Sequence, residues 1–178
     1  MKYSIPYGNR SMDFEIHTNR VLFSGEMTNI PPVSDFKEEL IRSLDAPIAS
    51  QSLASLAKGK KNILFLVEDN TRDTPLAEIL PVVTGYLKAA GIPESAVSFM
   101  TAPGTHRLMT DEEVREKLGS YIVDNFAVYQ HEASNTEELT DLGEVEAGGY
   151  KLPVRINRRA LEADLLVGVG NIIPHSDA

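Results

Sequence analysis

The pattern of apolar and polar positions predicts alternating strands and helices through the middle of the chain. Residues 63–67 (ILFLV) form an unbroken apolar run, which is typical of a strand covered on both faces. From Pro75 onward the apolar positions recur at helical spacing until Gly91, a residue type common just after a helix end. Further strands are predicted at residues 97–101, 126–130 and 163–170.

The segments around this repeating part carry start and turn signals. Thr110 followed by Glu113 has the spacing of a capping box, and Thr74 before Pro75 is a second predicted N-cap. Gly148-Gly149 within residues 144–155 predicts a β-hairpin. Shorter strands are predicted at 3–5, 14–17 and 21–23, and helices at 34–44, capped by Ser34, and at 50–58.

Strands that alternate with helices predict an α/β fold. We expect a mainly parallel, twisted sheet with helices on both faces (Rossmann-like), preceded by a short N-terminal β segment. At 178 residues the chain is long enough for one hydrophobic core, so residues 1–178 are interpreted as a single α/β domain.

The composition then narrows the range of functions. A net charge of −9 argues against a nucleic-acid partner, because a phosphate backbone requires a basic surface. Cysteine is absent, which excludes a disulfide framework and thiolate chemistry. The N-terminus lacks the apolar core of a signal peptide, and no apolar run reaches membrane-spanning length. These features predict a cytoplasmic protein with no membrane partner.

Polar side chains follow three of the predicted strands. In parallel sheets, ligands bind beyond the carboxyl ends of the strands, so we expect these three loops to face one crevice. The candidate residues are Asp69, Thr71 and Arg72 in the first loop, His106 and Arg107 in the second, and His175 in the third.

These residue types have chemical uses, and they also have plainer explanations. Histidine exchanges protons near neutral pH, and arginine binds a carboxylate or phosphate through two parallel hydrogen bonds. Two histidines on opposite sides of a substrate suit a reaction at both faces of one carbon atom, such as racemisation. Taken singly, Asp69 and Thr71 are better explained as a turn, and Arg72 as the partner of Asp69 or Asp73 at the surface. Gly168 and Gly170 lack the third glycine of a dinucleotide-binding motif.

Together, the three loops are similar to those of the nickel-pincer-nucleotide lactate racemases and related 2-hydroxyacid racemases and epimerases. The resemblance covers nearly the whole chain and corresponds to the N-terminal part of that family. Asn70 stands where the lactate enzymes have histidine, which leaves open which 2-hydroxyacid is the substrate. The segments that carry the resemblance are DNTRDTP (69–75), GTHR (104–107) and PH (174–175), supported by SIPYG (4–8), LDAPI (44–48) and EADLL (162–166).

The resemblance implies that the full-length protein is an isomerase that works by hydride transfer. His106 and His175 are the implied catalytic acid/bases. The implied cofactor is a pyridinium-derived nucleotide that carries nickel, and its lysine and nickel-binding histidine are expected beyond position 178, so no metal ligand is named in this chain. The expected cofactor- or substrate-binding residues are Asp69, Thr71, Arg72 and Arg107.

No covering helix follows the last predicted strand, so the chain is interpreted as the N-terminal domain of a longer two-domain enzyme, truncated at Ala178. Its expected partners are a small 2-hydroxyacid and its own C-terminal domain. We expect the isolated fragment to be inactive, with no cofactor bound. The alternative is a non-catalytic α/β domain that binds a small anionic metabolite or a nucleotide.

Overall fold

The computed structural model describes residues 1–25, 28 and 30–173, and the chain divides into two units. The first unit is Met1–Ser34 and the second is Asp35–Ala178. Each unit has its own hydrogen-bonded strands, so each is described by itself below.

The first unit is built on an antiparallel hairpin of β1 (Lys2–Tyr7) and β2 (Arg10–Glu15). It confirms the expected N-terminal β segment. The strand predicted at 21–23 is wrong. That stretch follows a short 3-10 helix, η1 (Thr18–Arg20), and its Leu22 and Phe23 side chains are 100% and 85% exposed. An apolar run becomes a strand only where a neighbouring strand takes its backbone hydrogen bonds, and within the described residues β1 pairs with β2 alone.

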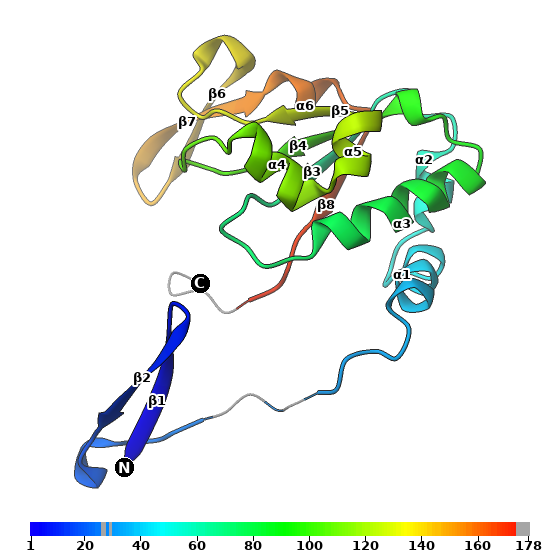
Figure 1. The fold of residues 1–178 in the computed structure, drawn as a ribbon. Helices are drawn as coiled ribbons and strands as arrows, with labels where there is room; N and C mark the ends of the chain where they lie inside the picture. The colour runs from blue at the N-terminus through cyan, green and yellow to red at the C-terminus, as the bar shows by residue number, and fades with distance from the viewer. Residues whose placement is uncertain (26–27, 29, 174–178) are drawn as a thin grey trace. The chain divides into compact units, whose positions relative to one another are not determined.

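The second unit contains a four-stranded parallel sheet in the order β5-β4-β3-β8 (Figure 1). This confirms the α/β class with a mainly parallel sheet. β3 is central, with β4 on one side and β8 on the other, although β8 comes last in sequence. The strands are β3 (Ile63–Val67), β4 (Val97–Thr101), β5 (Ala127–Gln130) and β8 (Leu165–Val169).

The hydrophobic core lies between one face of this sheet and the helices. Ile63, Phe65 and Val67 are every second residue of β3, so they point to the same face of the sheet, and each is at most 1% exposed. They join a cluster with the apolar stripe of α3 (Leu76–Ala89), in which Leu80 and Leu87 are almost completely buried. The other helices that contribute to the core are α2 (Leu53–Ala57), α4 (Asp111–Leu118) and α5 (Ser120–Asn125).

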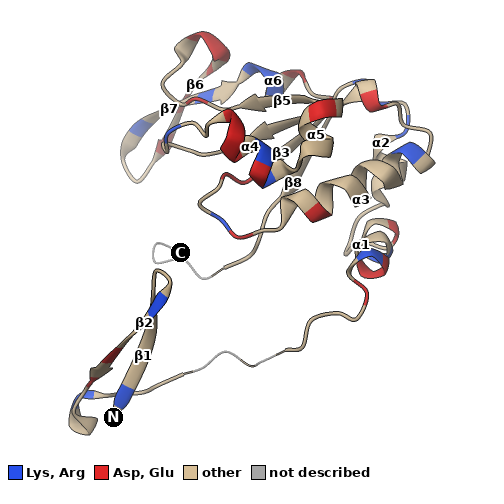
Figure 2. Ribbon diagram, in the orientation of Figure 1, with Lys and Arg blue, Asp and Glu red and all other residues tan. Residues whose placement is uncertain are grey.

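The predicted capping box opens α4. The Thr110 hydroxyl accepts from the Glu113 backbone N–H, while the Glu113 carboxylate accepts from the Thr110 N–H. The first turn of α4 is acidic and the last turn is basic, which complements the helix dipole (Figure 2). Gly119, at φ +85°, ends α4, and α5 begins at the next residue.

Two predicted caps are wrong. Asp35, one residue later than Ser34, caps α1 (Phe36–Asp45) by accepting from the Glu38 N–H at 2.9 Å. Thr74 does not cap α3, whose N-cap position is Pro75 without a side-chain hydrogen bond. The Thr74 hydroxyl donates instead to the carboxylate of Glu68, at the end of β3. The hydroxyl therefore binds a charged acceptor six residues earlier instead of the backbone at the start of α3.

The remaining elements connect the sheet strands. β6 (Leu139–Ala147) and β7 (Tyr150–Asn157) form the predicted hairpin, with Gly148 and Gly149 at φ +59° and +81° in its turn. None of the helices in the described residues combines the length and the apolar character needed to cross a membrane. Among the described residues, the other short helices are η2 (Glu94–Ala96), η3 (Thr136–Glu138) and α6 (Arg158–Glu162).

Candidate functional site

The carboxyl ends of β3, β4 and β8 meet at one edge of the sheet. The last residue of β3, Val67, is in register with Thr101 of β4 and with Val169 of β8. The Ala102 N–H donates to the Val67 carbonyl at 2.9 Å, so β3 and β4 remain joined where the loops begin. The strand order therefore places the starts of all three predicted loops next to one another.

The first loop is organised around the carboxylate of Asp69, which is 4% exposed. Its Oδ1 accepts from the backbone N–H of Thr71 at 3.1 Å and from the Thr71 hydroxyl at 2.5 Å. This is the turn that the plainer explanation predicted. It uses only one carboxylate oxygen, so the other is free to reach the neighbouring loop.

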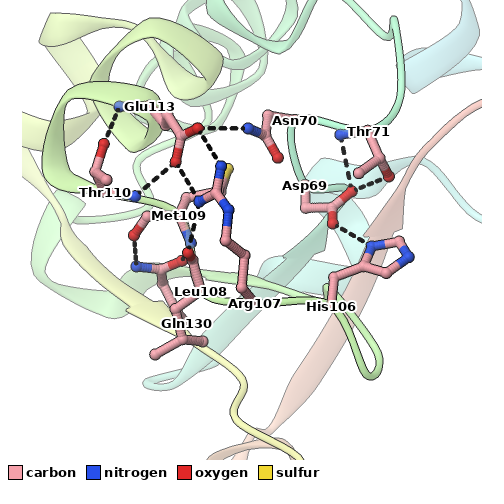
Figure 3. A network of polar contacts seen from close by, with 10 residues as sticks. All are labelled: Asp69, Asn70, Thr71, His106, Arg107, Leu108, Met109, Thr110, Glu113 and Gln130. Atoms are coloured by element: carbon pink, nitrogen blue, oxygen red, sulfur yellow. Dashed lines mark hydrogen bonds and ion pairs between the residues drawn. The ribbon is translucent and has the colours of Figure 1, made fainter.

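The second oxygen of Asp69 binds His106, in the loop after β4. The distance from His106 Nδ1 to Asp69 Oδ2 is 2.8 Å (Figure 3). An ionised carboxylate can only accept, so Nδ1 carries the proton and the unprotonated nitrogen of the neutral ring is Nε2. In Figure 3, Nε2 points away from Asp69, and the His106 side chain is 51% exposed. A buried carboxylate thus orients an accessible imidazole base.

The contacts around Asp69 also set its charge state. Burial alone would raise the pKa of this carboxyl group, because it penalises the charged form. Hydrogen bonds from the Thr71 hydroxyl, the His106 ring and the Thr71 N–H outweigh burial, and the net result is a lowered pKa. Asp69 therefore stays ionised at neutral pH and remains an acceptor for His106.

Arg72 is half-buried in the same loop. Its guanidinium donates to the Thr71 carbonyl at 3.4 Å, and within the part of the chain that the structure describes it forms no ion pair. The backbone of the loop is held separately, because the Lys117 ammonium donates to the carbonyls of Arg72 and Thr74. Arg72 therefore lies on a fixed loop with most of its donors uncommitted.

Arg107, beside His106, is engaged with α4. Its two terminal nitrogens donate to the two carboxylate oxygens of Glu113, at 2.7 and 2.6 Å. The Asn70 amide adds a third side-chain contact to Glu113 at 3.1 Å, which joins the first loop to the second (Figure 3). The paired Arg107 guanidinium, followed by the Thr110 N–H, lowers the pKa of Glu113 to about 2. Binding an anion through Arg107 would require it to leave or share Glu113.

Further contacts hold the loop that carries His106. Gly104, at φ +63°, lies in a turn that the His106 N–H closes by donating to the Pro103 carbonyl at 3.1 Å. At the other end, the Gln130 side-chain amide exchanges two 2.9 Å hydrogen bonds with the backbone of buried Met109. No local pattern indicates the pairing of Gln130 with Met109 or of Arg107 with Glu113, because each joins separate elements.

The third loop begins beside the first, where the Asn171 backbone N–H donates to Glu68 at 2.9 Å. His175, the other predicted catalytic histidine, lies outside the described residues. Within those residues the structure brings together Asp69, Thr71 and His106, with Arg72 and Arg107 on the same two loops. Across the same residues, no cluster of three or more histidine, aspartate or glutamate side chains could hold a metal ion.

A hollow of about 380 Å³ lies between the first loop and helices α3 and α4. It is lined by Asn70 and Thr74 of the loop, the start of α3, and Glu113 and Lys117 of α4. Neither His106 nor Arg72 lines it. The acid–base pair therefore opens outside this hollow, and the two are separate features of the strand edge.

The chain is similar to known lactate racemases. Residues 7–178 match the model of the family described as "Lactate racemase N-terminal domain". The lactate racemase of Thermoanaerobacterium thermosaccharolyticum is 32% identical over 173 residues, and that of Lactiplantibacillus plantarum is 33% identical over 174 residues. Both matches cover 96% of this chain but only 40% of the relative, so the chain spans well under half the length of these enzymes.

Solved structures agree with this similarity. The lactate racemase apoprotein from Thermoanaerobacterium thermosaccharolyticum superimposes with a TM-score of 0.74 at 31% identity, covering 94% of this chain and 38% of that one. A Thermotoga maritima protein shares the fold, with a TM-score of 0.58 at 24% identity over 74% of this chain and 32% of that one. The order of elements, the sheet and the matched length all agree, and the chain belongs to the lactate racemase N-terminal domain family.

Proposed function

We propose that this chain is the N-terminal domain of a 2-hydroxyacid racemase or epimerase, in which His106 is a catalytic acid/base. The observation that carries the proposal is the Asp69–His106 pair, at the edge of the parallel sheet where ligands bind. Membership of the lactate racemase family supports the reaction class. The activity would belong to the full-length protein, since the chain covers 40% of its lactate racemase relatives.

The role of His106 follows from its tautomer. With Nδ1–H held by Asp69, Nε2 is the free base, and it would accept the proton of the substrate hydroxyl at C2. The positive charge that forms on the ring is stabilised by the ionised Asp69 carboxylate, 2.8 Å from Nδ1. The same ring would return the proton when the hydroxyl group is restored. Asp69 itself would keep its negative charge throughout.

Arg72 would bind the anionic end of a ligand. It lies three residues after Asp69, its guanidinium has uncommitted donors, and the loop backbone around it is held by Lys117. A guanidinium matches the two oxygens of a carboxylate or phosphate, so Arg72 would anchor the substrate carboxylate or a cofactor phosphate. Thr71, fixed by Asp69, would set the course of the backbone that carries Arg72. Arg107 would enter the set only by sharing its Glu113 partner.

The residues present fit the cofactor that the family resemblance implies. An arginine with uncommitted donors suits a nucleotide phosphate, and an oriented imidazole suits a substrate held beside that nucleotide. When bound, a nickel-pincer nucleotide would supply the hydride chemistry that racemisation at C2 requires. Reaction at the opposite face of the carbon needs a second acid/base, and we assign that role to His175.

The experiment compares variants of the full-length protein loaded with its cofactor. We expect His106→Ala to reduce the interconversion of 2-hydroxyacid stereoisomers by about 10²-fold or more, the usual contribution of a positioned acid/base. The melting temperature should fall modestly, because buried Asp69 loses one of its three donors although the ring itself is half exposed. The readout is the rate of stereoisomer conversion, measured by chiral chromatography over a panel of 2-hydroxyacids.

His17→Ala is the matched control. His17 precedes η1 in the N-terminal unit and belongs to none of the three loops that follow the sheet strands. It should leave the rate unchanged. Full activity in His106→Ala, on a substrate that the unaltered protein converts, would remove His106 from the mechanism.

A second candidate is a non-catalytic domain that binds a small anionic metabolite or nucleotide. The observation in its favour is the guanidinium of Arg72, which has no ion-pair partner among the described residues. This alternative needs Arg72 but not His106. Binding of lactate or a mononucleotide that is lost in Arg72→Ala but kept in His106→Ala, without conversion of any 2-hydroxyacid, would favour it.

A further inference from the structure

Glu68, the residue before Asp69, reaches the third strand end instead of the second. Its Oε1 accepts from the backbone N–H of Asn171 at 2.9 Å, two residues after β8 ends. Its Oε2 accepts from the hydroxyl of Thr74, just before α3. One half-buried carboxylate at the end of β3 therefore holds both the chain that leaves β8 and the approach to α3.

Gly170 allows the chain to pass this close to Glu68. A Cβ atom at position 170 would lie 2.9 Å from Glu68 Oε1, closer than real Cβ atoms approach other atoms, so the end of the Glu68 side chain would have to shift. The φ angle of Gly170 is outside the left-handed region, so the backbone conformation does not require glycine here. Glycine leaves the Glu68 carboxylate the space to stay where it binds Asn171. Gly170 is therefore explained by its contact with Glu68 and not by a dinucleotide-binding motif.

We propose that Glu68 is a positioning residue that fixes the chain leaving β8 relative to the Asp69–His106 pair. Glu68 and Asp69 are adjacent just after β3, and their carboxylates bind the segments that follow its two neighbouring strands. Asp69 orients His106 after β4, and Glu68 fixes the backbone of Asn171 after β8. The consequence for catalysis rests on the proposed function, in which His175, four positions after Asn171 in the sequence, serves the second face of the substrate.

A plainer role for Glu68 is to hold Thr74 at the start of α3. Thr74→Val separates the two roles, because it removes the hydroxyl that donates to Oε2 and leaves Oε1 with Asn171. Glu68→Gln is the conservative variant, since its amide oxygen can accept from Asn171 while its NH₂ group faces Thr74. Glu78→Ala is the matched control, an exposed glutamate in the first turn of α3.

The first experiment measures hydrogen exchange of the Asn171 amide by NMR in the 178-residue chain. Loss of a hydrogen bond to a charged acceptor should speed exchange about tenfold or more in Glu68→Ala. Gly170→Ala should have the same effect, because the new methyl group displaces the carboxylate. Glu68→Gln, Thr74→Val and Glu78→Ala should keep the slow exchange. Unchanged exchange in both Glu68→Ala and Gly170→Ala would overturn the proposal.

The second experiment measures turnover of the full-length, cofactor-loaded protein. Misplacement of a catalytic group by about 1 Å can cost about 10²-fold in rate, so we expect Glu68→Ala to lower kcat by about tenfold or more while KM changes little. Glu68→Gln should keep kcat and the melting temperature close to those of the unaltered protein. An active protein whose kcat is the same in Glu68→Ala would refute the positioning role. If the unaltered protein converts no 2-hydroxyacid, the proposed function fails, and the exchange experiment still decides whether Glu68 fixes Asn171.

Discussion

Two clusters of acidic and basic side chains involve the loops after β3 and β4. They differ in whether the basic side chain keeps a nitrogen that a ligand could reach. In the first, Asp69 is almost completely buried and saturated by three donors, yet the His106 ring that it orients keeps an accessible nitrogen. In the second, Glu113 accepts from Arg107, Asn70 and Thr110, and both terminal nitrogens of Arg107 are committed.

The two clusters cannot be told apart by charge alone. Both clusters contain one acid and one base within hydrogen-bonding distance. Only the first combines a desolvated, fixed partner with a base that solvent or substrate can reach, which is the arrangement that general acid–base catalysis needs. The second fixes one loop to the other and to α4. Four predictions separate the two clusters.

The largest expected effect comes from Asp69→Asn in the full-length protein. An asparagine amide can donate to His106 Nδ1, which would move the ring proton to Nε2 and block the base. We expect the rate of 2-hydroxyacid conversion to fall about 10²-fold or more, with the site otherwise intact. Chiral chromatography measures the rate. A rate equal to that of the unaltered protein would show that the His106 tautomer does not matter.

The next effect is on folding. Asp69→Ala leaves the Thr71 N–H, the Thr71 hydroxyl and His106 Nδ1 without their acceptor, and we expect a loss of about 1–3 kcal/mol in the free energy of unfolding. Urea unfolding followed by circular dichroism measures it. Thr71→Val, which removes only the hydroxyl donor, should cost less, and an equal or greater cost would contradict the central place of Asp69.

The third prediction concerns pH. Asp69 has a lowered pKa in the folded chain, so below its unfolded pKa of about 3.9 the unfolded state binds more protons and stability falls. The stabilisation from Asp69 is complete above that pH and is lost as the pH falls through the folded-state pKa. In urea titrations from pH 7 into this acid range, Asp69→Asn should show a shallower loss of stability than the unaltered protein. Parallel curves would contradict this linkage.

The smallest effect is expected from the second cluster. The Arg107 side chain of its ion pair is 66% exposed, and water screens the attraction there, so Arg107→Ala should lower the melting temperature by less than Asp69→Ala does. If Arg107 has only the role of a loop contact, Arg107→Lys should keep the rate of 2-hydroxyacid conversion close to that of the unaltered protein. A large rate loss in both Arg107 variants, with the melting temperature unchanged, would instead give Arg107 the ligand-binding role that its sequence position predicted.

Most of the α/β unit could be predicted from local sequence, and the exceptions have physical causes. The strand at 97–101 and the capping box of α4 agree with the structure, because each depends on residues next to one another in sequence. The caps assigned to Ser34 and Thr74, and the strand at 21–23, do not agree. The Thr74 hydroxyl donates to the carboxylate of Glu68, six residues earlier, and Leu22 and Phe23 follow a hairpin whose strands already pair with each other.

The sequence by itself determined the α/β class, the places where polar loops follow the strands, and the residue types that those loops carry. The spacing of apolar residues and the capping residues of helices depend on neighbours in the sequence, so both can be recognised without a structure. Only the tertiary structure decided that Asp69 binds His106, that Arg107 is committed to Glu113, and that Glu68 reaches Asn171. These contacts depend on the strand order β5-β4-β3-β8, which places the last strand beside the first strand of the sheet. Hydrophobic spacing carries no information about which strand lies next to which.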